Sequence, residues 1–351
     1  LDGRWDVIVL LNGQVIVFGQ PTNEKSESRW QTLCEAVVPS GLTKLLAADL
    51  DRDTEETPDD HRFIGQRTSP AEKKEEIIGA SEMAEDADID LLVYGDDGVL
   101  FLRNVYDAAT KTRSLTALSQ EPTFEALRGV LAIAPADIDH DGDLDLIVSS
   151  NSGMSIWQNN DSREHTKFAD ISARSALPPS DLKATVLLPV DWNFDVQTDV
   201  LVTGLDVAKP GWLENISHGR LRWREFPRDY NRLGRSCSLH LMELQTNPLS
   251  WHLLAAGDDP SRDNLSTAPE VPVTRRVIGH WIDKGEWTKP GDGTLVADFD
   301  NDGKRESLAW RFGHDVFRIK DTFELKLKNG SRMVTCGIAD FDADGDEDVL
   351  V

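Results

Sequence analysis

The stretch PADIDHDGDLDLIVSS, residues 135–150, sets five aspartates between two apolar runs. Carboxylates crowded into a short loop repel one another, whereas the apolar residues on both sides favour burial of the flanking chain. Four of the aspartates occupy loop positions 1, 3, 5 and 9, and a glycine stands at position 6. Alternate residues of a tight loop can direct carboxylates inward, and glycine supplies the positive φ that turns a chain around an ion. The stretch therefore predicts a loop that binds a hard divalent cation through oxygen atoms.

The same acidic segment recurs along the chain. It returns nearly letter for letter as VADFDNDGKRESLAW at 296–310 and ADFDADGDEDVLV at 339–351, and without its glycine as PVDWNFDVQTDVLVTG at 189–204. AADLDRD at 47–53 and EDADIDLLVYG at 85–95 supply the two halves of a further copy, which a polar insert interrupts. Self-similarity of this kind is the signature of a repeat architecture.

The repeat has a period of about 53 residues, which suits one blade of a β-propeller and is too long for leucine-rich, ankyrin or tetratricopeptide units. In each copy an apolar run leads into the acidic loop, and a β-branched run, a glycine-containing turn and a third strand follow. Helical periodicity is absent, except around AEKKEEIIGASEMAE at 71–85 within the insert. We predict an all-β fold, a β-propeller of four-stranded antiparallel blades.

We expect residues 1–351 to form a single propeller domain that is cut at both ends, because the chain opens and closes inside repeat-like sequence. The repeat units expected from the pattern are about 1–40, 41–125 with the polar insert 54–85, 126–180, 181–235, 236–290, 291–330 and 331–351.

Calcium is the ion that the loops predict. Oxygen ligands without histidine or cysteine favour it over zinc or copper, and magnesium prefers to keep several waters. The alternative is that the aspartates only form turns through local hydrogen bonds, but their recurrence at matching places favours a metal. We expect roughly three to five ions. The candidate ligands are Asp137, Asp139, Asp141 and Asp145; Asp340, Asp342, Asp344 and Asp348; Asp298, Asp300, Asp302 and Glu306; Asp191, Asn193, Asp195 and Asp199; and Asp49, Asp51 and Asp90 in the interrupted copy.

Two copies leave questions open. In the interrupted copy, Asp49 and Asp51 could join Asp86, or Asp53 and Asp90, or the insert could have abolished the site. In the segment 241–257 the acids are mostly lost, since the first loop positions read Glu243, Gln245 and Asn247, and we expect no ion there.

An EF-hand also begins with this acidic pattern but does not fit. It needs an acidic residue at loop position 12 and a helix on each side. Position 12 is Val148, Val202, Ala309 or Val351, and each lies within an apolar strand-like run.

Charge and composition narrow the function classes. With 62 acidic and 37 basic residues, the net charge of −25 disfavours nucleic acid and anionic membranes as partners and fits cation binding. The three cysteines are too far apart for a disulfide framework or a zinc site. The eight histidines show no metal-pair spacing, and no nucleophile, metalloprotease or phosphate-loop motif occurs. Catalysis therefore finds little support, although paired carboxylates for glycoside chemistry are not excluded.

The repeats resemble FG-GAP/VCBS repeats of integrin-α-type propellers. More narrowly, IWQNNDSREHTKFADISARSALP at 156–178 is similar to a connector of cartilage-acidic-protein-like and ASPIC/UnbV-type bacterial proteins. The resemblance implies seven blades, with six as the alternative, and calcium in the loop between the first and second strands of a blade. It also implies a secreted, periplasmic or cell-surface protein. The insert, the degenerate copy at 241–257 and the lack of an ASPIC/UnbV domain depart from the pattern.

We expect a non-catalytic, calcium-stabilised extracellular recognition or adhesion propeller that binds protein or polysaccharide. The resemblance places the ligand on the face opposite the calcium loops, where Trp212, Trp281 and Trp287 could stack on a sugar or pack within blades. The alternatives are a polysaccharide lyase or hydrolase on a similar propeller and an architectural domain beside a catalytic one. We expect no nucleic-acid partner and no membrane insertion, and the sequence leaves the oligomeric state open.

Overall fold

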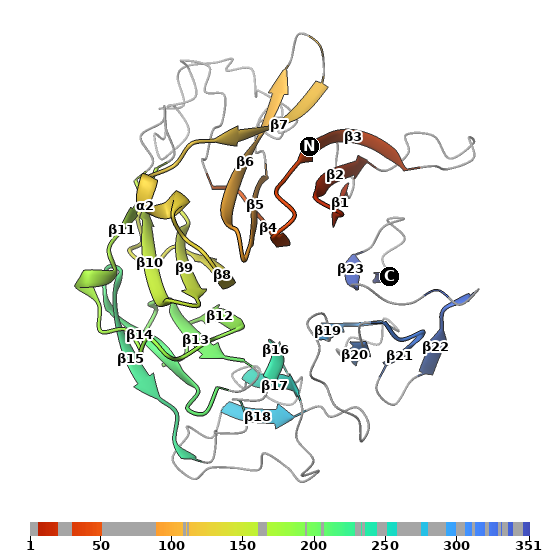
Figure 1. Cartoon of the computed structure of the whole chain (residues 1–351). Coiled ribbons are helices and arrows are strands. Elements are labelled where there is room, and N and C mark those ends of the chain that lie inside the picture. Colours follow the sequence, from red (N-terminus) through yellow and green to blue (C-terminus); the bar gives the residue numbers. More distant parts are fainter. Residues whose placement is uncertain are drawn as a thin grey trace, which may run out of the picture. The chain divides into compact units, whose positions relative to one another are not determined.

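The computed structural model describes most of the N-terminal half of the chain and shorter stretches of the C-terminal half (Figure 1). The described residues are 6–19, 30–50, 89–107, 110, 112–160, 167–193, 195–204, 207–228, 233, 236–243, 251–257, 275–279, 293–299, 306–310, 313–319, 323–328, 331, 336–339 and 347–351. The polar insert at 54–85 lies outside them, and so do the central aspartates of the two C-terminal acidic loops.

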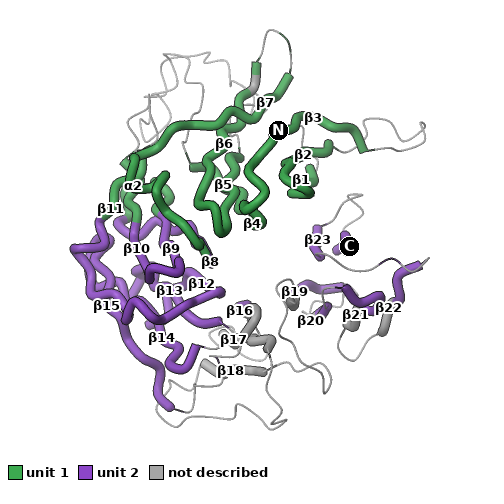
Figure 2. The backbone as a smooth tube through the Cα atoms, viewed as in Figure 1, with its two compact units in different colours: residues 1–130, 140–145, 157–170 green, residues 131–139, 146–156, 171–351 purple. Residues whose placement is uncertain are grey.

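The chain forms two compact units (Figure 2). Unit 1 contains residues 1–130, 140–145 and 157–170, and unit 2 contains residues 131–139, 146–156 and 171–351.

Unit 1 begins with two sheets in which neighbouring strands run antiparallel. The first is three-stranded, with the order β1 (Asp6–Leu11), β2 (Gln14–Gly19) and β3 (Gln31–Val37). The second is four-stranded, with the order β4 (Leu42–Ala48), β5 (Asp90–Gly95), β6 (Gly98–Asp107) and β7 (Thr112–Leu118).

Two further four-stranded sheets carry the acidic loops that the structure describes best. One has the order β8 (Val130–Ala136), β9 (Asp145–Ser150), β10 (Gly153–Asn159) and β11 (Phe168–Asp170). The next is antiparallel throughout, with the order β12 (Val186–Val190), β13 (Asp199–Thr203), β14 (Gly211–Ser217) and β15 (Arg220–Glu225). In both sheets the second strand is fully buried, which fits its run of Leu, Ile and Val.

The rest of the described chain forms three smaller or less regular sheets. They are β16 (Ser236–Glu243), β17 (Trp251–Gly257) and β18 (Arg275–Gly279); β19 (Gly293–Ala297), β20 (Glu306–Trp310), β21 (Val316–Ile319) and β22 (Phe323–Lys326); and β23 (Gly337–Ala339) with β24 (Asp348–Leu350). β17 and β18 pair in parallel, which departs from the antiparallel blades that we predict.

Each unit has its own apolar core. In unit 1, Val15, Leu91 and Leu102 belong to a cluster that joins the first two sheets. In unit 2, Ile138 and Ile147 pack with Val200 and residues of β14 and β15, so the loop after β8 is anchored by a fully buried side chain. Burying such a side chain contributes about 1.5–3 kcal/mol, which fixes the position of the loop backbone.

The all-β prediction is confirmed, together with four-stranded antiparallel sheets. Strands, not helices, flank the described acidic loops, as the exclusion of an EF-hand requires. Two short helical turns were not predicted: α2 (Pro122–Glu125), whose Phe124 packs on Trp157 and Phe168, and η2 (Ser172–Arg174). None of the described helices is long and apolar enough to cross a membrane.

Candidate metal centre

The best-described acidic loop connects β8 to β9 within one sheet. Asp137 follows the last residue of β8, and Asp145 is the first residue of β9. Gly142 has a φ of 94°, as predicted for loop position 6, and His140 at position 4 has a φ of 64°. Two left-handed residues in one short loop turn the chain tightly enough to bring its first half together.

Asp137, Asp139 and Asp141 each offer a carboxylate oxygen, and these oxygens all lie within 4.8 Å of one another. Asp137 and Asp139 are partly buried, and Asp141 is exposed. The backbone N–H of Asp143 donates to Asp141 Oδ1 over 2.9 Å, which restrains that side chain within the loop. Three carboxylates at such separations repel one another in the absence of a cation, and an all-oxygen set fits calcium by charge and ligand type.

Asp145, the predicted fourth ligand, is buried and accepts a hydrogen bond from the backbone of its own sheet. Its side chain is fully buried, and its Oδ1 accepts the backbone N–H of Asn159 over 2.7 Å. Asn159 ends β10, so this bond ties the end of the third strand to the start of the second. The carboxylate therefore organises the backbone of its sheet, whether or not it also contacts an ion.

The same arrangement occurs in the neighbouring sheets. Asp199 is fully buried; its Oδ1 accepts the N–H of Asn215 over 2.7 Å, and its Oδ2 accepts the N–H of Trp192 over 3.1 Å. Burial raises the pKa of Asp199 to about 6, although these two hydrogen bonds work in the opposite direction. Asp195 and Asp191 raise this pKa further through their negative charges.

In the interrupted copy, Asp90 is fully buried. Its Oδ1 accepts the N–H of Asn104 over 3.0 Å, and its Oδ2 accepts the N–H of Leu50 over 3.3 Å. The chain thus returns to the residue after Asp49 despite the insert, which brings the two halves of the interrupted copy together. Asp51, Asp53 and Asp86 lie outside the described residues.

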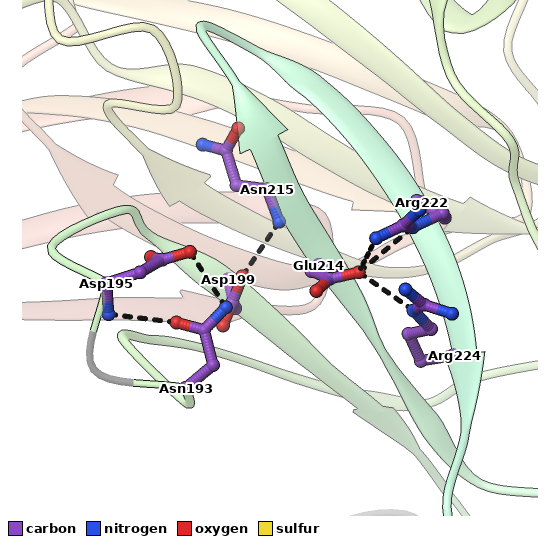
Figure 3. A network of polar contacts seen from close by, with 7 residues as sticks. All are labelled: Asn193, Asp195, Asp199, Glu214, Asn215, Arg222 and Arg224. Carbon is purple, nitrogen blue, oxygen red and sulfur yellow. Dashed lines mark hydrogen bonds and ion pairs between the residues drawn. The ribbon is translucent and has the colours of Figure 1, made fainter.

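The loop at 191–199 is arranged differently from the loop at 137–145. Asp191 accepts the backbone N–H groups of Asp195 and Val196, each over 3.1 Å. Asn193 donates its Nδ2 to Asp195 Oδ2 over 2.8 Å, and its Oδ1 accepts the N–H of Asp195 over 2.9 Å (Figure 3). Internal hydrogen bonds therefore occupy the carboxylates of Asp191 and Asp195. The donors to these carboxylates are backbone N–H groups of the loop and the side-chain amide of Asn193.

Val196 occupies the position that Gly142 holds in the other loop, and its φ is 73°. A β-branched residue in this region is strained. Its side chain is also 79% exposed, so no burial offsets that strain. The loop therefore has the left-handed turn without the glycine that would adopt it with little strain.

Two asparagines in the third strands, Asn159 at the end of β10 and Asn215 near the end of β14, are the residues that sequence reasoning missed. Asn159 donates its Nδ2 to the backbone oxygen of Leu50 over 2.8 Å, and Asn215 donates its Nδ2 to the backbone oxygen of Ile138 over 2.7 Å. Leu50 and Ile138 each follow the first aspartate of an acidic loop in the preceding sheet. The signal was present, because FLRN, IWQN and WLEN all end in Asn, but the partner lies in another repeat.

A second polar cluster lies on the β14–β15 hairpin. Glu214 Oε2 accepts hydrogen bonds from Arg222 Nη2 over 2.7 Å, from Arg222 Nε over 3.0 Å and from Arg224 Nε over 2.8 Å (Figure 3). Partial burial works to raise the pKa of Glu214, but the hydrogen bonds and charges of the two arginines outweigh it and hold that pKa below its usual value.

The remaining predicted ligands lie wholly or partly outside the described part of the chain. Asp298 follows β19, and Asp348 begins β24, in positions that match their counterparts. Outside the described residues lie Asp300, Asp302, Asp340, Asp342, Asp344 and the side chain of Glu306. These sites stay predictions.

Trp212 packs within the protein. Its ring lies 5.1 Å from that of Phe226 and against the cluster around Leu201, which accords with the packing interpretation. Trp281 and Trp287, the other two candidates for sugar stacking, lie outside the described residues.

Comparisons with known proteins give a likeness of structure only. No protein-family model matches the sequence, and no curated protein matches it. A lectin of Agrocybe aegerita, solved for its specific recognition of non-reducing terminal N-acetylglucosamine, matches 99% of this chain and 84% of its own. The TM-score is 0.55 at 13% identity, which supports a propeller-like all-β fold.

A second solved structure, of BBS1N in complex with ARL6DN and soaked with lead, matches 96% of this chain and 81% of its own. Its TM-score is 0.49 at 9% identity, which is too low to support an inference.

Proposed function

We propose that this chain is a calcium-stabilised, propeller-like recognition domain that binds carbohydrate outside the cell and has no catalytic activity of its own. The observation that carries the proposal is the carboxylate triad of Asp137, Asp139 and Asp141, set in a sheet of a fold that resembles a lectin along nearly its whole length. The resemblance of the repeats to FG-GAP/VCBS sequences supports the same assignment.

The residues of the loop fit calcium on chemical grounds. Three aspartates would supply oxygen ligands, and the left-handed turn at His140 and Gly142 bends the loop around their common centre. A bound divalent ion would offset the mutual repulsion of the carboxylates. It would also join the ends of β8 and β9, so its role here would be to stabilise the sheet.

The ligand would bind at the opposite end of each sheet, at the turns between the second and third strands. In the sheet of β8–β11 this turn contains Asn151 and Ser152, which are exposed. Lys183 donates to the backbone oxygens of Asn151 and Ser180, so a neighbouring segment holds the turn in place. Exposed amide and hydroxyl groups on a fixed turn are suitable partners for sugar hydroxyls.

A glycan array probed with the chain in calcium tests the proposal. We expect saturable binding to one class of glycan, weakened by Ser152→Arg at the proposed turn. Asn160→Arg is the matched control, because Asn160 is exposed and follows the other end of β10. The proposal is wrong if no glycan binds above the level of a denatured control, or if Asn160→Arg weakens binding as much as Ser152→Arg.

A further inference from the structure

We infer that Asn215 is a positioning residue for the acidic loop of the preceding sheet, so that ion binding by Asp137, Asp139 and Asp141 is linked to the packing of the β14–β15 hairpin. The inference rests on the calcium binding proposed above. Beyond that proposal, we infer that the ion stabilises the sheets β8–β11 and β12–β15 together, and that Asn215, which is not itself a ligand, links them.

Three contacts join the β14–β15 hairpin to the loop backbone. Asn215 Nδ2 and the backbone N–H of Gly219 both donate to the backbone oxygen of Ile138, over 2.7 Å and 2.8 Å. His218 Nδ1 lies 3.3 Å from the backbone oxygen of Asp139. A carbonyl oxygen has two lone pairs, so the first two donors fill both acceptor positions of Ile138.

Ile138 is well placed to transmit this constraint, because it stands between the ligands Asp137 and Asp139. Its side chain is fully buried in the core that also contains Leu213 and Leu221 of the hairpin. The peptide groups on both sides of Ile138 therefore have little freedom. Their orientation sets the direction in which the two neighbouring carboxylates leave the backbone.

The hairpin is itself a rigid partner. Ser217 pairs with Arg220, and the two residues between them have positive φ values, 39° for His218 and 74° for Gly219. A two-residue turn of this type matches the natural twist of the strands. Asn215 is held from its other side, since its backbone N–H donates to the buried Asp199 while its side-chain amide points away from that residue (Figure 3).

The molecule contains a matched control. Asn159 makes the same two kinds of bond. Its backbone N–H donates to Asp145, which a substitution by alanine leaves in place, and its side chain donates to Leu50, in the loop of a different sheet. Asn159 and Asn215 are both almost completely buried, so their substitution should cost similar stability. They should differ in their effect on the loop at 137–141.

The test compares calcium affinity in Asn215→Ala and Asn159→Ala by calorimetric titration of the metal-free chain. Asp141→Ala identifies the ion that belongs to this loop as the one lost from the wild-type count. We expect Asn215→Ala to lower the affinity of the loop for that ion about tenfold, because the loss of a residue that orients metal ligands typically has an effect of this size. Asn159→Ala should leave the calcium affinity of this loop within about twofold, because the side chain that it removes contacts the loop of another sheet and the backbone bond to Asp145 is kept.

Hydrogen exchange of the wild-type chain provides a second readout that needs no variant to fold. Calcium should slow exchange of the Gly219 amide, because that N–H donates to the loop that the ion orders. The inference is overturned if calcium binds but Asn215→Ala leaves its affinity unchanged, or if bound calcium leaves Gly219 exchange unaltered. If no calcium binds to the wild-type chain, the proposed function fails as well.

Discussion

The loops at 137–145 and 191–199 share a hydrogen bond to a buried aspartate at their ends but differ in how their other polar side chains are arranged. Each ends in a buried aspartate that accepts the backbone N–H of an asparagine in the third strand. In the first loop three carboxylates converge. In the second, Asn193 replaces the middle carboxylate. Backbone N–H groups donate to Asp191, and the Asn193 amide and the Gln197 N–H donate to Asp195. The hydrogen bond to the buried aspartate is therefore common to both loops, whereas, of these two described loops, only the first brings three carboxylates together.

The largest effect should come from the part that the loops share. Asp145→Ala removes the acceptor of the buried Asn159 N–H, and Asp199→Ala removes the acceptor of the buried Asn215 N–H and of the Trp192 N–H. Each substitution should lower the free energy of unfolding by about 2–4 kcal/mol in metal-free buffer. Chemical denaturation measures both. A loss below about 1 kcal/mol for either variant would mean that the buried aspartate is not a common structural element.

The pH dependence of stability should report Asp199. Its pKa is raised to about 6 in the folded chain, so folding favours the protonated carboxyl group. The stabilisation is present in full below the unfolded pKa of about 3.9 and is lost as the pH rises through about 6. In metal-free buffer, the stability of the wild type relative to Asp199→Asn should therefore fall between about pH 4 and pH 7. A relative stability that rises over this range would contradict the assignment.

The two loops differ in backbone strain at loop position 6, where one has Val196 and the other Gly142. Val196→Gly should raise the free energy of unfolding by about 1 kcal/mol, because glycine adopts a φ of 73° without a side-chain clash. Gly142→Val should lower it by a similar or larger amount, because Gly142 has a φ of 94°. Thermal melts of both variants check the pair. Changes of the same sign would show that the two loops do not share this turn.

The smallest effect should come from the exposed face of the β14–β15 hairpin. Glu214→Gln removes the charge that holds Arg222 and Arg224, whose side chains are 43% and 44% exposed. Water screens such pairs, so the loss should be about 0.5–1 kcal/mol and should shrink with added salt. A salt-independent loss above about 2 kcal/mol would show that the cluster supports the sheet more than its exposure suggests.

The sequence was sufficient for the features that depend on local pattern. Apolar and β-branched runs predicted strands on both sides of the acidic loops, and the left-handed φ of Gly142 followed from its loop position. Val196 shows the limit of that reasoning, because the left-handed turn persists at position 6 although the glycine that predicted it there is absent.

Contacts between repeats could not be predicted in the same way. Asn159 and Asn215 reach loops 109 and 77 residues away in sequence, and spacing alone carries no information on which carbonyl they meet. The burial of Asp145 was also not evident from the sequence. The sequence presents Asp145 as one more carboxylate in a loop, whereas the structure gives it a fully buried place in the sheet.

The most direct test of the account is the melting temperature of the metal-free chain with and without calcium, for the wild type and for Asp141→Ala. An ion that binds only the folded chain stabilises it by about 2.7 kcal/mol at a hundred times its Kd. We expect calcium to raise the wild-type Tm by several degrees, magnesium to raise it less, and Asp141→Ala to lose part of the calcium effect. A wild-type Tm that is the same in calcium and in EDTA would contradict the claim that divalent ions stabilise this protein.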